Sequence, residues 1–475
     1  MKKILTMMLV LVFLLSVCGC SLSKKHEDKE TEISFSFWEP GVSHEIEDAL
    51  RKVADGYEEL HPDVKIRLIS ESVDSYQDWI KSGVVSDSLP DIESNQGANL
   101  LPQYNAGLVM DISHELDCES AYAGGQMWRD TFKDTYLDAT YENKFIPFFG
   151  VELGMYYNKT IYEELGLEVP QTWNEFINNC EVIKNSGKLP IAFMGQKADA
   201  CEWLNWDIAG GLFAKKHLSN KNININGDIS LSRYETYRAL LTGEVDFAKN
   251  AEYQQEYREY VKRLKEYLKY CGGYPGLGES VAKAMFLSGE AAHIYTGSWD
   301  VYGLMKNSNV GFEVGIFHFP LFTENETPYC GKRIKHLSKQ SIAVTKSAYA
   351  QEGKLEKVID FLQYFTSKEV YREFINNTAL LPVIEDVECV EGTDVFEYDG
   401  YYQDLLLLSD ESYGGDELIY DFLSGNEPSL DSSFFERMQK NLMKQANNYA
   451  AANKLSAENG YYMKENMSEV FKDEG

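Results

Sequence analysis

Four short stretches of the sequence place indole rings or side-chain amides among carboxylates and other polar groups. They are Trp38-Glu39, Asn95-Gln96, Glu202-Trp203 with nearby Trp206, and Trp299-Asp300. An indole ring can bind the apolar face of a ligand, while amides and carboxylates hydrogen-bond its polar groups. Two carboxylates can also act as an acid and a base in hydrolysis. These residue types predict a recognition surface, with a hydrolytic site as the alternative.

The composition favours recognition of a small ligand over recognition of nucleic acid. Aromatic residues make up 13% of the chain, with 31 Tyr and 7 Trp, which is more than a core requires. The formal net charge is -30, from 75 acidic and 45 basic residues. Phosphate binding needs a basic face, so nucleic acid is not an expected partner. We interpret the excess acid as a well-solvated surface and not as a cation-binding feature.

A further candidate is Glu152, the one acid in the apolar stretch 145–159, which reads F-I-P-F-F-G-V-E-L-G-M-Y-Y-N-K. Pro147, Gly150 and Gly154 disfavour an amphipathic helix, and a buried strand should be more continuous. We interpret the stretch as extended chain that passes between two bodies, with Glu152 near the junction. An ordinary core strand with one carboxylate at its edge is the alternative from this local pattern.

Alternating strands and helices position the first two stretches. Strands are expected over residues 33–38, over 64–69 and from residue 90, with a helical segment between each pair. This order is typical of a mostly parallel sheet with helices on its faces. Ligands of such sheets bind beyond the carboxyl ends of the strands. Trp38-Glu39 and Asn95-Gln96 therefore lie at a candidate rim.

The other two stretches belong to different elements. Trp203 and Trp206 are three residues apart in an expected helix, so they share a face and form either core or a platform at a cleft. A strand that ends in a tight turn at Gly297 precedes Trp299-Asp300. This places both residues at the carboxyl end of a strand and the start of a helix, where ligands commonly bind.

The N-terminus has the features of an export signal. Met1-Lys2-Lys3 is positively charged, and the apolar run 4–17 is shorter than the ~20 residues that span a bilayer. Val17-Cys18-Gly19-Cys20 resembles a bacterial lipobox, with Cys18 as its less usual member. We predict a signal peptide over 1–19, lipidation of Cys20, and a flexible tether over 20–32.

Six further cysteines are dispersed along the chain. They are Cys118, Cys180, Cys201, Cys271, Cys330 and Cys389. No C-x-x-C pair occurs, so neither a zinc or redox centre nor any other cofactor is expected. Disulfides and buried free thiols both remain possible for an exported chain.

The order of several motifs resembles the family 1 extracellular solute-binding proteins of ABC importers, the carbohydrate-binding lipoproteins that are similar to maltose-binding protein. The motifs are Pro90-Asp91-Ile92, 107–112, 156–159, Gly166-Leu167, 170–176, 289–292, Gly297-Ser298-Trp299, 342–345 and the helix around Asp360. They cover nearly the whole chain after Cys20, and the lipobox adds to their specificity.

This resemblance implies an α/β fold of two lobes, each a mostly parallel sheet flanked by helices, joined by a hinge. Lobe 1 would comprise 33–146 and 289–347, and lobe 2 would comprise 147–288 and 348–475. The family binds a mono- or oligosaccharide between the lobes and delivers it to membrane permease subunits. We therefore expect a monomeric, lipid-anchored protein at the outer face of the cytoplasmic membrane, on the periplasmic side if an outer membrane exists.

The resemblance also assigns residues. Glu152 falls where the family has a cleft carboxylate, and Trp299 falls where it has an aromatic ring that stacks on the sugar. The looser matches are Trp38, Glu39, Asn95, Gln96, Glu202, Trp203 and Trp206, with Asp300 beside Trp299 and with Tyr401 and Tyr402 as a further aromatic pair.

Two other functions remain as alternatives. An exported glycosidase would need two carboxylates about 5–10 Å apart, but no partner for Glu152 is evident and no G-x-S-x-G, H-E-x-x-H or P-loop motif occurs. We therefore do not expect an enzyme. An anionic glycan would need a basic cleft, for which Arg333, Lys335 and His336 are the candidates. A charged face without a ligand is the preferred interpretation of that cluster.

Overall fold

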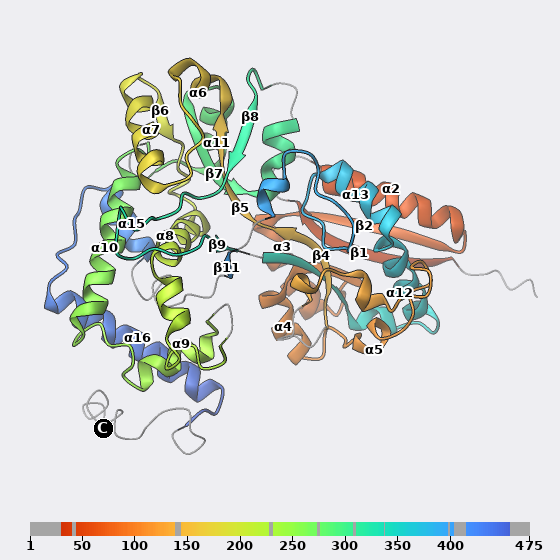
Figure 1. Ribbon diagram of the computed structural model, residues 1–475. Coiled ribbons are helices and arrows are strands. Elements are labelled where there is room, and N and C mark those ends of the chain that lie inside the picture. Colours follow the sequence, from red (N-terminus) through yellow and green to blue (C-terminus); the bar gives the residue numbers. More distant parts are fainter. Residues whose placement is uncertain are drawn as a thin grey trace, which may run out of the picture.

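The computed structural model describes residues 30–39, 44–137, 144–227, 231–272, 276–306, 310–336, 338–397, 400–402 and 415–456. The predicted signal peptide, Cys20 and most of the predicted tether lie outside these residues. The described elements form two bodies, each built on a sheet that is flanked by helices (Figure 1). We call them the first body and the second body.

The sheet of the first body has five strands in the order β2-β1-β3-β10-β4. Their bounds are β1 (Thr31–Glu39), β2 (Val64–Ser72), β3 (Ile92–Gln96), β4 (Ile146–Val151) and β10 (Ser338–Val344). Strand β1 is parallel to β2 and β3, whereas β10 is antiparallel to β3 and β4. The three expected N-terminal strands are confirmed. Because β1 begins at Thr31, the predicted tether is two residues too long.

Helices whose apolar faces point inward cover this sheet. They are α2 (Glu45–Leu60), α3 (Val73–Ser86), α4 (Gly97–Asn105), α5 (Ser113–Leu116), η1 (Trp128–Thr131), η2 (Asp134–Tyr136), η6 (Lys346–Tyr349), α12 (Lys354–Phe365) and α13 (Lys368–Thr378). In α2 the buried residues Ile46, Leu50, Val53 and Tyr57 recur every three or four positions, the spacing of one helix face. They pack in one core with α12 and α13.

The sheet of the second body has four strands in the order β6-β7-β5-β8. Their bounds are β5 (Leu153–Asn158), β6 (Leu189–Ile191), β7 (Ala291–Gly297) and β8 (Val314–Phe317). Strand β6 is parallel to β7, and β5 is antiparallel to β7 and β8. A separate pair joins β9 (Ile334–Lys335) to β11 (Tyr401–Tyr402) in parallel.

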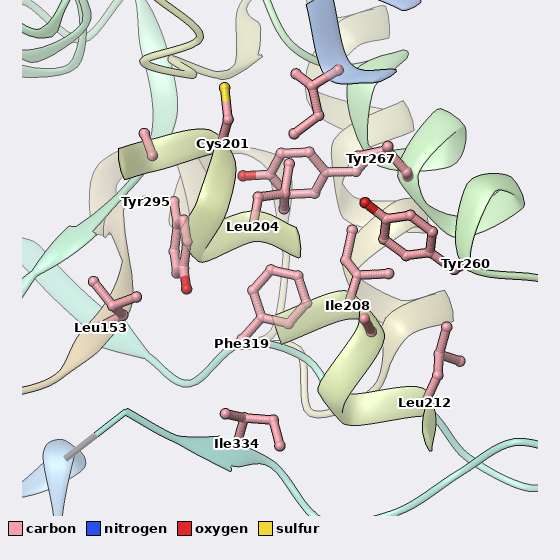
Figure 2. Packing of buried hydrophobic residues seen from close by; sticks show 14 of the residues in the cluster. Leu153, Cys201, Leu204, Ile208, Leu212, Tyr260, Tyr267, Tyr295, Phe319 and Ile334 are labelled. Carbon is pink, nitrogen blue, oxygen red and sulfur yellow. The ribbon is translucent and has the colours of Figure 1, made fainter. Parts of the chain in front are cut away.

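The second body carries most of the remaining helices. They are α6 (Lys159–Leu165), α7 (Trp173–Asn185), α8 (Ala198–Ser219), α9 (Arg233–Leu241), α10 (Ala251–Leu268), α11 (Glu279–Leu287), η4 (Ser298–Asp300), η5 (Tyr302–Lys306), η7 (Asp394–Phe396), α15 (Gly415–Leu423) and α16 (Ser432–Ala452). Helix α8 runs through the core, where Leu204 and Ile208 pack among Tyr267, Phe319 and their neighbours (Figure 2). This packing fixes the helix that carries Trp203.

The stretch 145–159 is confirmed as extended chain that crosses between the bodies. Strand β4 ends at Val151 in the first sheet and β5 begins at Leu153 in the second, with Glu152 between them. Pro147 is tolerated because β4 is an edge strand and its register against β10 shifts at that point. A Cβ on Gly154 would lie 2.9 Å from Ile316, so this position has no room for a side chain.

The predicted lobe boundaries are wrong in three segments. Residues 147–151 of β4, assigned to lobe 2, belong to the first sheet. Strands β7 and β8, assigned to lobe 1, belong to the second sheet. Helices α12 and α13, assigned to lobe 2, pack on the core of the first body. The reason is that the chain returns to the first body at β10, which pairs with β4 in antiparallel orientation. The helices that follow β10 therefore pack on the first body. These antiparallel pairings also make both sheets mixed, where mostly parallel sheets were expected.

Two further properties follow from the described residues. None of their helices combines the length and apolar character that a membrane span requires. None of the six cysteines within these residues forms a disulfide. The open choice between disulfides and thiols is therefore resolved in favour of thiols.

Candidate functional site

A cleft of about 250 Å³ lies between the two bodies. The residues from the first body that line it are Trp38, Gln77, Asn95, Gln96, Asn99, Val151 and Gln340. Those from the second body are Lys197, Asp199, Trp203, Glu279 and Trp299. We call these two sets the first wall and the second wall. Five predicted residues meet here: Trp38, Asn95, Gln96, Trp203 and Trp299.

Three indole rings line the cleft, and strand ends position two of them. Trp38 is at the end of β1, and Trp299 follows β7 in η4. Trp203 comes from α8, and its ring centroid is 5.2 Å from that of Trp299 at an angle of 60°. The ring of Trp299 lies so close to Gly297 that a Cβ at that position would overlap it. Gly297 is therefore required for close approach of the ring.

Side-chain amides dominate the first wall, and Asn95 is their centre. Its Oδ1 accepts hydrogen bonds from Gln77 Nε2 at 2.9 Å, Asn99 Nδ2 at 3.0 Å and the backbone N–H of Gln96 at 2.9 Å. Its Nδ2 donates to Glu93 Oε1 at 2.9 Å. The first wall thus presents neutral polar groups that are tied to one buried side chain.

A chain of ion pairs supports the second wall. Lys197 Nζ is 2.7 Å from Glu279, which is 2.8 Å from Lys283, and Lys283 is 2.7 Å from Asp300. Burial disfavours the charge on Lys283, but the Asp300 and Glu279 carboxylates outweigh it and raise the pKa of the amine. Burial also opposes ionisation of Glu279, but hydrogen bonds and charge from Lys197 and Lys283 lower its pKa overall. The charges of these four residues are compensated within the protein.

Glu152 is buried and binds the crossing segments to one another. Both carboxylate oxygens accept from the backbone N–H of His336 at 3.1 Å, and Oε1 also accepts from Leu153 N at 3.0 Å. The Glu152 carbonyl accepts from Ser298 N at 2.8 Å. Burial raises the pKa of the carboxyl, against the lowering effect of His336. Glu152 was predicted to line the cleft, but its oxygens bind the backbone next to β9 and it is not among the lining residues.

The family of the protein follows from comparison with known sequences. The family of bacterial extracellular solute-binding proteins matches residues 43–372. The chain belongs to this family. This confirms the resemblance that the sequence motifs suggested.

Curated relatives of this solute-binding protein carry sugar-binding names. The multiple sugar-binding protein of Streptococcus mutans serotype c is 23% identical over 314 residues, 64% of this chain and 66% of that protein. The melibiose/raffinose/stachyose-binding protein MelE of Bacillus subtilis (strain 168) is 22% identical over 252 residues, 51% of this chain and 55% of that protein. The matched part thus spans between about half and two thirds of these relatives.

Solved structures share the fold along most of the chain. RafE from Streptococcus pneumoniae without ligand has a TM-score of 0.62 and 17% identity, covering 88% of this chain and 98% of that one. A chitin oligosaccharide binding protein has a TM-score of 0.64 and 17% identity, covering 88% and 99%. These likenesses confirm the predicted two-lobe α/β fold.

The other predicted residues of this solute-binding protein do not line the cleft. Glu39 is buried and accepts from the Glu47 N–H at 2.7 Å at the start of α2, and burial raises its pKa to about 8. Asp300 lies behind the wall, held by Lys283 and by Thr296 Oγ1 at 2.6 Å. Trp206 packs with its ring 6.0 Å from that of His336.

Glu202 and the basic cluster are also absent from the lining. Arg333 donates to the Phe319 carbonyl at 3.3 Å, and His336 pairs with Asp207 at 3.0 Å. His336 and Asp207 are both buried, so His336 is not part of an exposed charged face. Arg333 and Lys335 are half-buried. The side chains of Tyr401 and Tyr402 lie outside the described residues.

Seven lining residues were missed: Gln77, Asn99, Val151, Lys197, Asp199, Glu279 and Gln340. Helical spacing offered a signal for one of them. This applies within α8, where Asp199 is four positions before Trp203 and therefore on the same face. Asn99 is in α4 whereas Asn95 is in β3, so helical spacing does not link these two. Gln77 and Gln340 come from distant elements, and no local pattern marks them.

Proposed function

We propose that the protein is the substrate-binding component of a carbohydrate ABC importer, and that it closes on a mono- or oligosaccharide by hinge motion. The carrying observation is one interbody cleft that combines three tryptophans with hydrogen-bonding amides and compensated charges. A sugar ring has apolar C–H faces that stack on indoles and a rim of hydroxyls that bind polar groups. The names of the sugar-binding relatives point the same way.

The ligand we favour is a neutral sugar. Lys197 and Glu279 pair with one another in the second wall, and the first wall is built from amides and Trp38. An anionic glycan would need uncompensated positive charge, and Arg333, Lys335 and His336 are not among the lining residues. A cleft of this kind binds through hydrogen bonds and stacking.

Thermal unfolding with a ligand panel tests this function. We would titrate the soluble chain without its first 29 residues with raffinose, melibiose, galactose and chitotriose, and with a tripeptide as the control. A sugar at 100 times its dissociation constant should add about 2.7 kcal/mol to the free energy of unfolding. Stabilisation by the tripeptide, with no response to any sugar, would contradict the proposal.

We propose no catalytic role. The carboxylates in the lining are Asp199 and Glu279, both from the second body, and paired lysines lower the pKa of Glu279. A general acid needs a raised pKa, so Glu279 is poorly suited to protonate a leaving group. Chromatography of an oligosaccharide during incubation with the protein should show unchanged sugar, and released fragments would indicate a glycosidase.

We also propose that lipidated Cys20 anchors a monomer at the outer face of the cytoplasmic membrane, where it delivers ligand to permease subunits. Support comes from the Val17-Cys18-Gly19-Cys20 motif. Cells that produce the full chain should incorporate labelled palmitate into it, and Cys20→Ala should abolish this labelling. Retained labelling in the variant would assign the lipid to another residue. Size-exclusion chromatography with light scattering measures the oligomeric state.

A further inference from the structure

A buried acid lies directly beneath the first wall. Glu93 is in β3, and its side chain is fully buried. Its Oε1 accepts two hydrogen bonds of 2.9 Å, from Asn95 Nδ2 and from Gln103 Nε2. Burial raises the pKa of Glu93, against the lowering effect of these two bonds. A carboxyl group in this position is costly to bury, so its bonds should have a defined role.

The direction of the hydrogen bonds follows from the chemistry of Oε1. A carboxyl oxygen that carries no proton can only accept, and Oε1 accepts from Asn95 Nδ2. Asn95 must therefore direct its NH₂ group toward Glu93. Its Oδ1 then faces away from Glu93, toward the cleft-lining amides.

The orientation of the Asn95 amide in turn fixes the orientation of the Gln77 and Asn99 amides. Gln77 and Asn99 both donate an N–H to Asn95 Oδ1, and the oxygen of each amide has no hydrogen-bond partner among the described residues. Both side chains line the cleft. Gln340 also lines the cleft, but its Oε1 is buried, so it is not an acceptor that a ligand can reach in this structure.

We propose that Glu93 is a positioning residue that fixes the hydrogen-bond polarity of the first wall, so that Gln77 and Asn99 offer acceptor oxygens to the ligand. This inference rests on the proposed sugar-binding function and deepens it. The first wall then selects ligands whose hydroxyls donate on the side that faces the first body. A deoxyfluoro sugar loses such a bond because fluorine has no proton to donate.

The orientation can be measured without any ligand. Neutron diffraction from deuterium-exchanged crystals of the unliganded protein locates the amide deuterons. We expect the Asn95 deuterons to point to Glu93 Oε1, and those of Gln77 and Asn99 to point to Asn95 Oδ1. The reverse orientation at Asn95 would overturn the proposal. This result does not depend on whether any sugar binds. It therefore distinguishes failure of the proposed role of Glu93 from failure of the proposed function.

Binding to Glu93→Gln tests the consequence for selectivity. A glutamine at this position can donate or accept, so the direction of the Asn95 amide is no longer fixed. We expect the variant to bind the most stabilising sugar of the panel roughly tenfold more weakly, the effect of one or two lost hydrogen bonds. The ratio of affinities between that sugar and its monodeoxyfluoro analogues should also fall toward one.

Gln103→Leu is the matched control. It removes the second donor to Glu93, but Gln103 does not line the cleft. We expect this variant to keep the wild-type affinity and the wild-type ratio for the fluorinated analogues. If Glu93→Gln weakened the parent sugar and all analogues by the same factor, Glu93 would be only structural and the proposal would be wrong. If Glu93→Gln does not fold, the neutron map still decides the question.

Discussion

The two walls of the cleft solve the problem of binding a polar ligand in different ways. In the first wall, neutral amides converge on Asn95, and a single buried carboxyl beneath them sets their direction. In the second wall, charged side chains compensate one another from Lys197 to Asp300, and two tryptophans provide the apolar surface. The first wall depends on orientation, and the second depends on compensated charge and stacked rings.

This difference separates affinity from selectivity. A tryptophan buries 150–250 Å² on contact, which at about 25 cal/mol per Å² is worth several kcal/mol before costs. A neutral hydrogen bond contributes only about 1 kcal/mol net. Loss of a tryptophan should therefore have a large effect on affinity, whereas changes to the amides of the first wall should mainly alter which ligand is preferred.

The largest effect is expected from Lys283→Met. This change leaves Asp300 buried without its cation, and removing one partner of a buried ion pair typically costs about 3–5 kcal/mol. The midpoint of urea denaturation should fall accordingly. Lys197→Met at the other end of the chain is the matched control, because Lys197 is more exposed and Glu279 retains Lys283. Equal losses for both variants would show that the stabilising effect of these ion pairs does not increase from the cleft toward the interior.

A smaller effect, on affinity, is expected from Trp299→Ala. Removal of this ring should weaken binding of the best sugar by about 2 kcal/mol, roughly thirtyfold, measured by isothermal titration calorimetry. Trp206→Phe is the control, since Trp206 is one turn from Trp203 in α8 but does not line the cleft. A larger loss from Trp206→Phe would move the site away from the described cleft.

The sequence alone predicted those parts of this comparison that depend on strand ends. Trp38 and Trp299 each follow a strand whose alternation is visible locally, so their place at a rim could be inferred. The crossing at 145–159 was also visible, because Pro147, Gly150 and Gly154 fit extended chain at an edge. These features depend on the residue and its near neighbours.

Features that depend on distant partners could not be predicted. The Glu152 carboxylate binds the backbone of His336, 184 positions away, and this pairing removes it from the cleft. Asn95 was placed at the rim, but its role depends on Gln77, 18 positions earlier. The lobe boundaries failed for the same reason, since only the pairing of β10 with β4 shows where the chain returns.

The pH dependence of stability should show that Glu39 has a structural role, unlike the adjacent Trp38, which lines the cleft. Burial raises the folded-state pKa of Glu39 to about 8, well above that of an unfolded glutamate. Its stabilising contribution is therefore complete below about pH 4 and is lost as the pH rises toward 8. Relative to Glu39→Gln, the wild type should lose on the order of 4 kcal/mol across this range in urea denaturation.

Sugar affinity should not follow the titration of Glu39. Glu39 does not line the cleft, and all the residues of the first wall have neutral side chains. Titration calorimetry of wild type and Glu39→Gln at pH 6 and pH 8 should give the same ratio of dissociation constants. A ratio that changes with pH would mean that the first wall is electrostatically coupled to this acid.

The smallest effect is expected from Gly297→Ala. The backbone at Gly297 has φ of -93°, which alanine adopts readily, so only the added methyl group matters. That methyl would overlap the Trp299 ring and force it to move, which should weaken binding by about 1 kcal/mol and shift the indole fluorescence. Gly303→Ala is the control, because a Cβ there meets no atom within 4 Å. If Gly297→Ala bound sugar normally, the position of the Trp299 ring would not limit the affinity of the second wall, and the contrast between the two walls would rest on charge compensation alone.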